Sequence, residues 1–160
     1  MRASARAEGP RAAPVIGLIQ RVREASVTID DQRVASINRG MLVLVGFQSG
    51  DRAQRLDRFI ERLLNYRIFP DADGRMNLSL RDIDGQLLAV PQFTLAADTG
   101  RGNRPSFTSA ASPELGRELF SDFERRLRST WPACAFGRFG ADMQVALVND
   151  GPVTFWLELK

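Results

Sequence analysis

With 160 residues, of which 44% are hydrophobic, the chain is long enough for one globular domain with a substantial core and too short for a second domain of ordinary size. The net charge is +3, and the first eleven residues supply +2 of it through three arginines and one glutamate, so the charge alone does not indicate a nucleic-acid partner. The chain has no histidine and one cysteine, which excludes a Ser-His-Asp triad, a Cys-His dyad, histidine-containing zinc sites and an internal disulfide.

No apolar run reaches the roughly 20 residues that a membrane-spanning helix needs. Residues 1–14 lack the apolar segment of a secretory signal, and as an organelle-targeting segment they are short and contain Glu8. We therefore expect a soluble, cytoplasmic protein with no membrane partner. We expect residues 1–14 to be a disordered extension or the result of a wrongly assigned translation start, and residues 15–160 to form a single domain.

The first third of the chain has the composition of β-strands. Its apolar and β-branched segments are separated by turn-forming residues such as Asp30-Asp31, which is typical of a β-meander, and they cover residues 15–22, 25–29, 33–37 and 41–47.

A helix is predicted next, beginning at Asp51 as N-cap with Gln54 three residues on. One face of this helix is apolar, with Leu56, Phe59, Ile60, Leu63 and Leu64. The other face is basic, with Arg52, Arg55, Arg58 and Arg62. Solvated arginines are the simplest interpretation, and a contact with an RNA backbone is the alternative.

The segment PDADGRMN begins like a calcium-binding loop at Asp71. Arg75 replaces the third oxygen ligand and no glutamate stands at the twelfth position, so we predict a tight turn instead. Residues 86–95, QLLAVPQFTL, predict a buried strand. Because Pro91 cannot donate to a strand ladder, this strand should lie at a sheet edge or be irregular at that residue.

A Gly- and Arg-rich segment, AADTGRGNRPSF, follows and is either an ordinary loop or a phosphate cradle. Ser112-Pro113-Glu114 then begins a second helix. The apolar residues predicted to face inward from it are Leu115, Leu119, Phe120, Phe123 and Leu127. Cys134 is predicted to be a small hydrophobic residue, buried or half-buried. The C-terminal segment LVNDGPVTFWLEL predicts a strand interrupted by an Asn-Asp-Gly-Pro cluster, for which a hairpin bend is the simplest interpretation.

Two separated segments carry a family resemblance: PQFTLAADTGRGNRPSF and NDGPVTFWL. They resemble the SQFTL and NXPVTF motifs of the bacterial and eukaryotic D-aminoacyl-tRNA deacylases. The segments LIQRVREASVTID, YRIFPDADGRMNLSL and GRFGADMQVALVNDGPVTFW are similar to the same family in order and spacing, so that the resemblance covers about residues 15–159.

The resemblance implies an α+β fold, a compact β-rich barrel-like domain with two main helices that forms a homodimer. It also implies hydrolysis of the ester that joins a D-amino acid, or glycine, to the 3′ end of tRNA, without a cofactor or a metal ion. In the family the Gly-Pro peptide, here Gly151-Pro152, is cis and enters the pocket of the partner subunit. Its carbonyls would hold the substrate ammonium so that an L-side chain clashes and a D-side chain points outward.

The same resemblance places Gln92, Phe93 and Thr94 at the catalytic pocket. Backbone N–H groups of this segment would bind the oxyanion, and Thr94 or the ribose 2′-OH would assist; the alternative is that Thr94 is only a residue suited to a strand. Arg21 would steady the Gly-Pro loop across the dimer, and Arg104 would meet the terminal adenosine or its phosphate.

This sequence departs from the family pattern in three places. Pro91 stands where the family usually has serine, Gly140 stands where alanine is common, and residues 1–14 have no counterpart. A related animal group has a PQ-type first motif with relaxed chiral rejection, but the VTF that follows Gly-Pro here resembles the stricter group. Two other functions fit the sequence: a non-catalytic RNA-binding dimer, and an esterase that uses Thr94 on small substrates.

Overall fold

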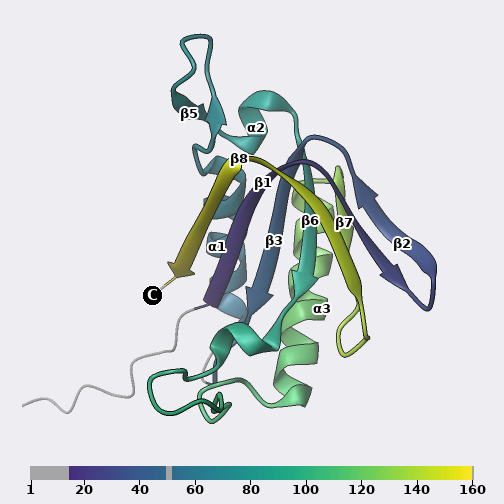
Figure 1. Cartoon of the computed structure of the whole chain (residues 1–160), viewed down its shortest axis with the longest axis vertical. Helices are drawn as coiled ribbons and strands as arrows, with labels where there is room; N and C mark the ends of the chain where they lie inside the picture. Colours follow the sequence, from purple (N-terminus) through teal and green to yellow (C-terminus); the bar gives the residue numbers. More distant parts are fainter. Residues whose placement is uncertain (1–14, 50–51, 160) are drawn as a thin grey trace, which may run out of the picture.

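A computed structural model describes residues 15–49 and 52–159 (Figure 1). The strands, helices and 3₁₀ turns (η) of this part of the chain are, in order, β1 (Val15–Ile29), β2 (Gln32–Ile37), β3 (Gly40–Gly46), η1 (Ala53–Arg55), α1 (Leu56–Asn65), β4 (Phe69–Pro70), β5 (Met76–Leu78), α2 (Leu80–Ile83), β6 (Gln86–Pro91), η2 (Phe93–Ala96), α3 (Pro113–Thr130), β7 (Cys134–Phe136) and β8 (Gln144–Leu159). The predictions for residues 1–14 and for the Asp51 N-cap lie outside the described residues.

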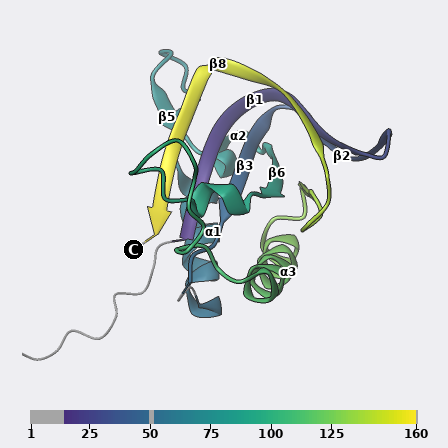
Figure 2. The ribbon, with the colours of Figure 1, turned by 60° about the horizontal axis from the view of Figure 1, so that its bottom comes forward.

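The main sheet is built around the long strand β1. Its strand order is β2-β1-β3-β6-β7, and β8 pairs antiparallel with β1 along most of its length. The first half of β1 pairs with β3 and the second half with β2, whereas β3, β6 and β7 run parallel to one another. Figure 2 shows β1 and β8 curving together over the rest of the sheet, and β2 comes back beside β6 and β7. The predicted barrel-like, β-rich domain is confirmed.

Strand β3 is apolar on both faces because each face belongs to a different core. Met41, Val43 and Val45 lie in the core between the sheet and the helices, where every one of them is buried. Leu42 and Leu44 point the other way, into the core enclosed by the curved sheet. This alternation follows from the two-residue period of a strand.

Gly40 allows β3 and β6 to approach each other at their N-terminal ends. It pairs with Gln86, and a Cβ atom at Gly40 would lie 1.8 Å from the carbonyl oxygen of Gln86. No side chain larger than hydrogen fits there without moving backbone. At the other end of the same pair of strands, Val45 lies opposite Pro91.

The helices α1 and α3 cover one face of the sheet, and their rings of Phe59 and Phe123 lie 5.9 Å apart. Both predicted apolar faces are confirmed, with Leu115 partly buried and the other nine residues buried. Ser112 caps α3 by accepting a hydrogen bond from the N–H of Leu115 at 3.2 Å. Within the described residues no helix is both long enough and apolar enough to cross a membrane.

The strand that contains Pro91 is not at an edge, so that part of the prediction is wrong. β6 lies between β3 and β7. The alternative, a local irregularity, fits better, because pairing with β7 ends at Ala89 and Pro91 is the last residue of β6. The missing N–H of proline therefore removes no hydrogen bond between β6 and β7.

The turn between β4 and β5 is organised by Asp71. Its carboxylate accepts hydrogen bonds from the N–H groups of Asp73 at 2.9 Å and Arg75 at 3.0 Å, and its carbonyl accepts from Gly74 at 3.0 Å. The predicted tight turn is confirmed. Cys134 is partly buried, as predicted, and burial raises the pKa of its thiol.

Candidate active site

Gln92, Phe93 and Thr94 form the turn that follows β6. The Gln92 N–H donates to the carbonyl of Val45 at 2.8 Å, and the Leu95 N–H donates to the carbonyl of Gln92 at 3.2 Å. These two bonds fix the turn to β3 and close η2. Phe93 and Thr94 are the first residues of η2, so their N–H groups have no acceptor within that turn. The turn thus offers backbone donors to a ligand.

The side chains of this turn are accessible. Phe93 is 57% exposed and its ring lies 5.3 Å from that of Phe107. Phe93 is therefore not part of the core. The Gln92 amide donates to the Thr94 hydroxyl oxygen, which leaves the hydroxyl proton available to another acceptor.

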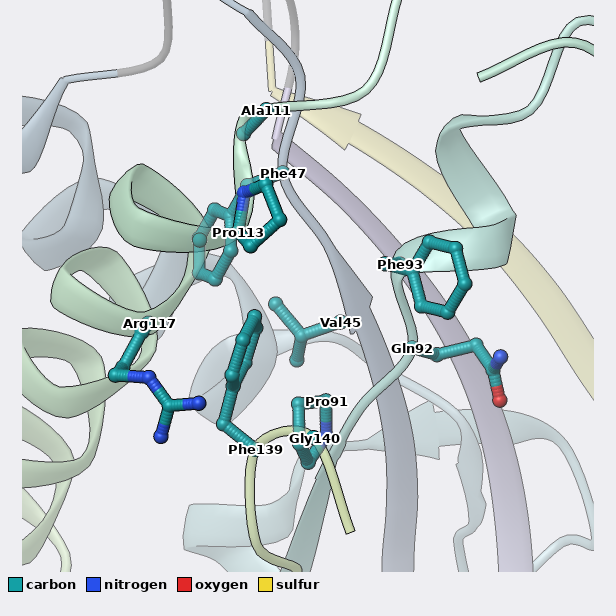
Figure 3. A pocket seen from close by; sticks show the side chains of 11 residues that line it. Val45, Phe47, Pro91, Gln92, Phe93, Ala111, Pro113, Arg117, Phe139 and Gly140 are labelled. Carbon is teal, nitrogen blue, oxygen red and sulfur yellow. The ribbon is translucent and has the colours of Figure 1, made fainter. Parts of the chain in front are cut away.

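A cavity of about 290 Å³ lies beside the turn. It is lined mainly by apolar side chains, with Gln92 and Phe93 at one side and Arg117 and Phe139 at the other (Figure 3). The Arg117 guanidinium carbon lies 5.1 Å from the centre of the Phe139 ring. The cavity joins residues from β6, α3 and the segment before β8, which are far apart in sequence.

The Gly151-Pro152 segment is a local bulge within β8. The strand continues on both sides of it against β1, so the hairpin interpretation is wrong. The Gly151-Pro152 peptide bond is cis. Both residues are exposed, and Gly151 has a φ of 148°.

Asn149 holds the bulge closed with its own side chain. Its Oδ1 accepts from the Val153 N–H at 2.7 Å, and its Nδ2 donates to the Val153 carbonyl at 3.3 Å and to the Thr154 hydroxyl at 3.0 Å. A Cβ atom at Gly151 would lie 2.9 Å from the Val153 nitrogen. The segment is therefore fixed at both of its ends by local contacts.

Arg21 supports the same segment from β1. Its side chain is 13% exposed and donates to the carbonyl of Asp150 at 2.7 Å and to the carbonyl of Ile68 at 2.8 Å. The Asp150 carboxylate also lies 3.5 Å from Arg23. Arg21 thus contacts the Gly-Pro segment of its own chain; the contact across a dimer stays a prediction.

The two segments do not meet within one chain. The turn after β6 lies near residue 17 of β1 and the bulge near residue 21, so the two segments stand beside opposite ends of β3. The difference is about 13 Å along the strand, and three strand spacings of about 4.8 Å lie between β6 and β8. Arg104, in the loop after η2, is exposed, and its predicted contact with the adenosine or its phosphate stays a prediction.

Comparison with known proteins agrees with this geometry. The model of a family described as D-Tyr-tRNA(Tyr) deacylase matches residues 18–158. A D-aminoacyl-tRNA deacylase from Nitrosococcus oceani is 53% identical over 145 residues, 91% of this chain and 94% of the relative. The chain belongs to the D-aminoacyl-tRNA deacylase family.

Further relatives of this family cover the chain to the same extent. A D-aminoacyl-tRNA deacylase from Ralstonia nicotianae is 56% identical over 150 residues, which are 91% of this chain and 90% of the relative. The solved structure of a c-Myc DNA unwinding element binding protein is 36% identical, with a TM-score of 0.86 over 91% of this chain and 99% of that one. The expected family membership is confirmed.

Three residues that shape this site were not predicted from the sequence: Asn149, Arg117 and Phe139. Asn149 was visible in the NXPVTF motif, and an asparagine two residues before Gly-Pro is a signal for a side chain that bonds to nearby backbone. Arg117 and Phe139 carried no such signal. Their contact depends on Gly116, where a Cβ atom would lie 3.1 Å from the Phe139 ring.

Charged groups with shifted pKa values lie away from the turn. Asp122 of α3 accepts hydrogen bonds from Arg126 and Arg125, which lower the pKa of its carboxyl. No carboxylate of the described residues contacts the Thr94 hydroxyl, and no group of acidic residues and cysteine there could hold a metal ion. The chemistry offered at the turn is thus that of backbone N–H groups, an amide and a hydroxyl.

Proposed function

We propose that the protein hydrolyses the ester bond of D-aminoacyl-tRNA, and of glycyl-tRNA, and rejects L-aminoacyl-tRNA through a Gly-Pro segment of a second subunit. The observation that carries the proposal is the exposed turn Gln92–Thr94, whose backbone donors stand beside a cavity in a chain of this family. Its substrate occurs in the cytoplasm, so we expect the protein to act there.

The turn supports ester hydrolysis without an attacking side chain. The free N–H groups of Phe93 and Thr94 would bind the oxyanion, a contribution worth about 2.7–4 kcal/mol per donor in other enzymes. No carboxylate of the part of the chain that the structure describes bonds to the Thr94 hydroxyl, and its oxygen already accepts from Gln92, so we assign it the role of a hydrogen-bond donor. Water, or the ribose 2′-OH of the substrate, would supply the nucleophile.

The cavity supports binding of the terminal adenosine. It is apolar, lies directly beside the turn, and has the Phe139 ring and the Arg117 guanidinium along one wall. Aromatic rings and guanidinium planes are the groups on which nucleic-acid bases stack. An adenine in this cavity would bring its ribose ester towards Gln92 and Phe93.

The position of Gly151-Pro152 supports a site shared between two copies. The segment is exposed and rigidly held, yet it lies about 13 Å along the strands and three strand spacings away from the turn. A homodimer would bring the segment of one copy to the turn of the other. Carbonyl groups of Gly151 and Pro152 would then bind the substrate ammonium and leave no space for an L-side chain, whatever its identity.

One assay tests these assignments together. The purified protein is incubated with D-Tyr-tRNA, L-Tyr-tRNA, Gly-tRNA and a small D-tyrosyl ester that has no nucleoside, the methyl ester of D-tyrosine, and release of free amino acid is measured. We expect release from D-Tyr-tRNA and Gly-tRNA alone. Release from none would indicate an RNA-binding protein without activity, release from the small ester would indicate a general esterase, and release from L-Tyr-tRNA would contradict chiral rejection.

A further inference from the structure

A second concave surface adjoins the cavity of the proposed active site. This groove, of about 560 Å³, lies between α3 and the segment that follows β7, and it shares Arg117 and Phe139 with the cavity. Arg128 and Arg138 also line it, as do Ser121 and Glu124. The groove and the cavity are therefore two parts of one continuous surface, separated by the Arg117–Phe139 pair.

The two parts differ in chemistry. The cavity is apolar, whereas the groove carries three arginines and one glutamate. Glu124 pairs with Arg128 at 2.8 Å, and Arg128 also lies over the Phe136 ring. Arg117 and Arg138 have no acidic partner among residues 15–49 and 52–159. The groove thus keeps an excess of positive charge.

The α3 side of the groove is a straight polar stripe. Arg117, Ser121, Glu124 and Arg128 are separated by four, three and four residues, which places them on one face of a helix. From Arg117 to Arg128 the stripe is about 16 Å long, at about 1.5 Å per residue. This length accommodates more than one nucleotide, and its first member already belongs to the cavity.

We propose that this groove binds the phosphates of the unpaired nucleotides that precede the terminal adenosine of tRNA. The inference rests on the proposed function, because it takes the adenosine to lie in the cavity. With the base there, the strand leaves past Arg117 and its backbone runs along the groove towards Arg138 and Arg128. Guanidinium groups match phosphate oxygens in geometry and charge, and such contacts bind RNA without reading its sequence.

The exposed arginines on α1 are the competing surface for RNA. Arg58 and Arg62 lie on the outer face of that helix, and neither lines the cavity or the groove. A strand that ends in the cavity reaches the groove first, since the two share residues. We therefore assign the nucleotides next to the adenosine to the groove.

The test compares affinity for deacylated tRNA at several salt concentrations. Arg128→Ala/Arg138→Ala should bind about tenfold more weakly, and the slope of log affinity against log salt should fall by about 1.4, at about 0.7 per lost phosphate contact. Glu124→Gln should bind about two- to threefold more tightly, because it removes the groove's negative charge. Arg125→Ala, an ion-paired arginine on another face of α3, is the matched control and should bind like the wild type.

A weaker interaction caused by misfolding cannot mimic this pattern, since one variant is expected to gain affinity. Wild-type affinity and slope in the double variant, or a loss in Glu124→Gln, would overturn the proposal. So would a tenfold loss in Arg58→Ala/Arg62→Ala with an unchanged groove variant, because that result places the strand on α1.

Kinetics separate the groove from the proposed function. The double variant should lower kcat/KM for D-Tyr-tRNA about tenfold relative to kcat/KM for 3′-O-(D-tyrosyl)adenosine, which has no preceding nucleotides. An equal loss on both substrates would overturn the groove assignment. If the wild type hydrolyses neither substrate, the proposed function fails, and the tRNA affinities still decide what the groove binds.

Discussion

The turn after β6 and the bulge in β8 are built in different ways. The turn is anchored to β3 by backbone bonds, from Gln92 to Val45 and from Leu95 to Gln92, and its Phe93 and Thr94 side chains are exposed. The bulge is held by side chains, with Asn149 closing it and Arg21 bonding to it from β1.

This difference is consistent with the two roles proposed for the segments. A turn that must bind a developing negative charge needs unpaired N–H groups, so its own hydrogen bonds are few. A segment that excludes a substrate by steric clash must keep its conformation when that substrate binds. It therefore needs stabilising contacts from neighbouring residues. Substitutions should therefore be more damaging at the bulge and its supports than at the turn's side chains, and four variants test that order.

The largest loss is expected for Gly151→Ala. The φ of 148° disfavours any L-residue, and the new Cβ atom would lie 2.9 Å from the Val153 nitrogen that donates to Asn149. We expect kcat/KM for D-Tyr-tRNA to fall at least about a hundredfold, or about 2.7 kcal/mol of barrier. Gly74→Ala is the control, because Gly74 also has a positive φ but has open space around it. It should lose stability and keep activity; equal activity in both variants would contradict the assigned role of the bulge.

Arg21→Lys should have the second largest effect. A lysine ammonium cannot reproduce the fork that bonds to the carbonyls of Asp150 and Ile68 together. We expect about a tenfold fall in the ratio of D-Tyr-tRNA to L-Tyr-tRNA hydrolysis, roughly 1.4 kcal/mol. Arg23→Lys is the matched control on the same strand, since Arg23 is exposed and makes only an ion pair with Asp150. A wild-type ratio in Arg21→Lys would show that the bulge needs no support from β1.

Thr94→Ala should weaken deacylation less than about tenfold, because the backbone donors of the turn survive the change. Single-turnover hydrolysis of D-Tyr-tRNA measures this effect, and circular dichroism checks the fold. Complete inactivity of the folded variant, together with an acyl group trapped on Thr94 in the wild type, would show instead that the hydroxyl attacks the ester.

The smallest effect is expected for Pro91→Ser, which restores the residue usual in the family. Pro91 is the last residue of β6, and the pairing of β6 with β7 ends at Ala89. The backbone N–H that serine adds therefore disturbs no hydrogen bond between these strands. We expect kcat/KM to stay within about threefold, or roughly 0.7 kcal/mol. A loss beyond tenfold would mean that this cavity is adapted to the proline ring.

Much of the fold follows from local patterns. The apolar faces of α1 and α3, the Ser112 cap and the Asp71 turn were predictable because each depends on residues a few positions apart. The interior position of β6 was not predictable in this way, since Pro91 indicates an edge and only the short β7 shows otherwise.

The site shows the same division. Gln92, Phe93 and Thr94 form one turn, as their adjacency requires, and the side chain of Asn149 bonds to Val153 and Thr154, four and five positions away. The Arg117–Phe139 wall and the Arg21–Ile68 contact join residues more than twenty positions apart. No periodicity records such contacts, because they depend on how the elements pack.

Gly40, at the start of β3, affects the position of the turn at the other end of the β3–β6 pair. Because β3 is apolar on both faces, a one-residue slip against β6 would still bury hydrophobic side chains everywhere, and alternation cannot select the alignment. Gly40 does select the alignment, because a slip would bring a residue with a side chain against the Gln86 carbonyl. The same slip would carry the turn at Gln92 about 3.3 Å along the strand. A residue without any side chain, about 20 Å from Gln92 by strand rise, thereby sets where the proposed oxyanion donors stand.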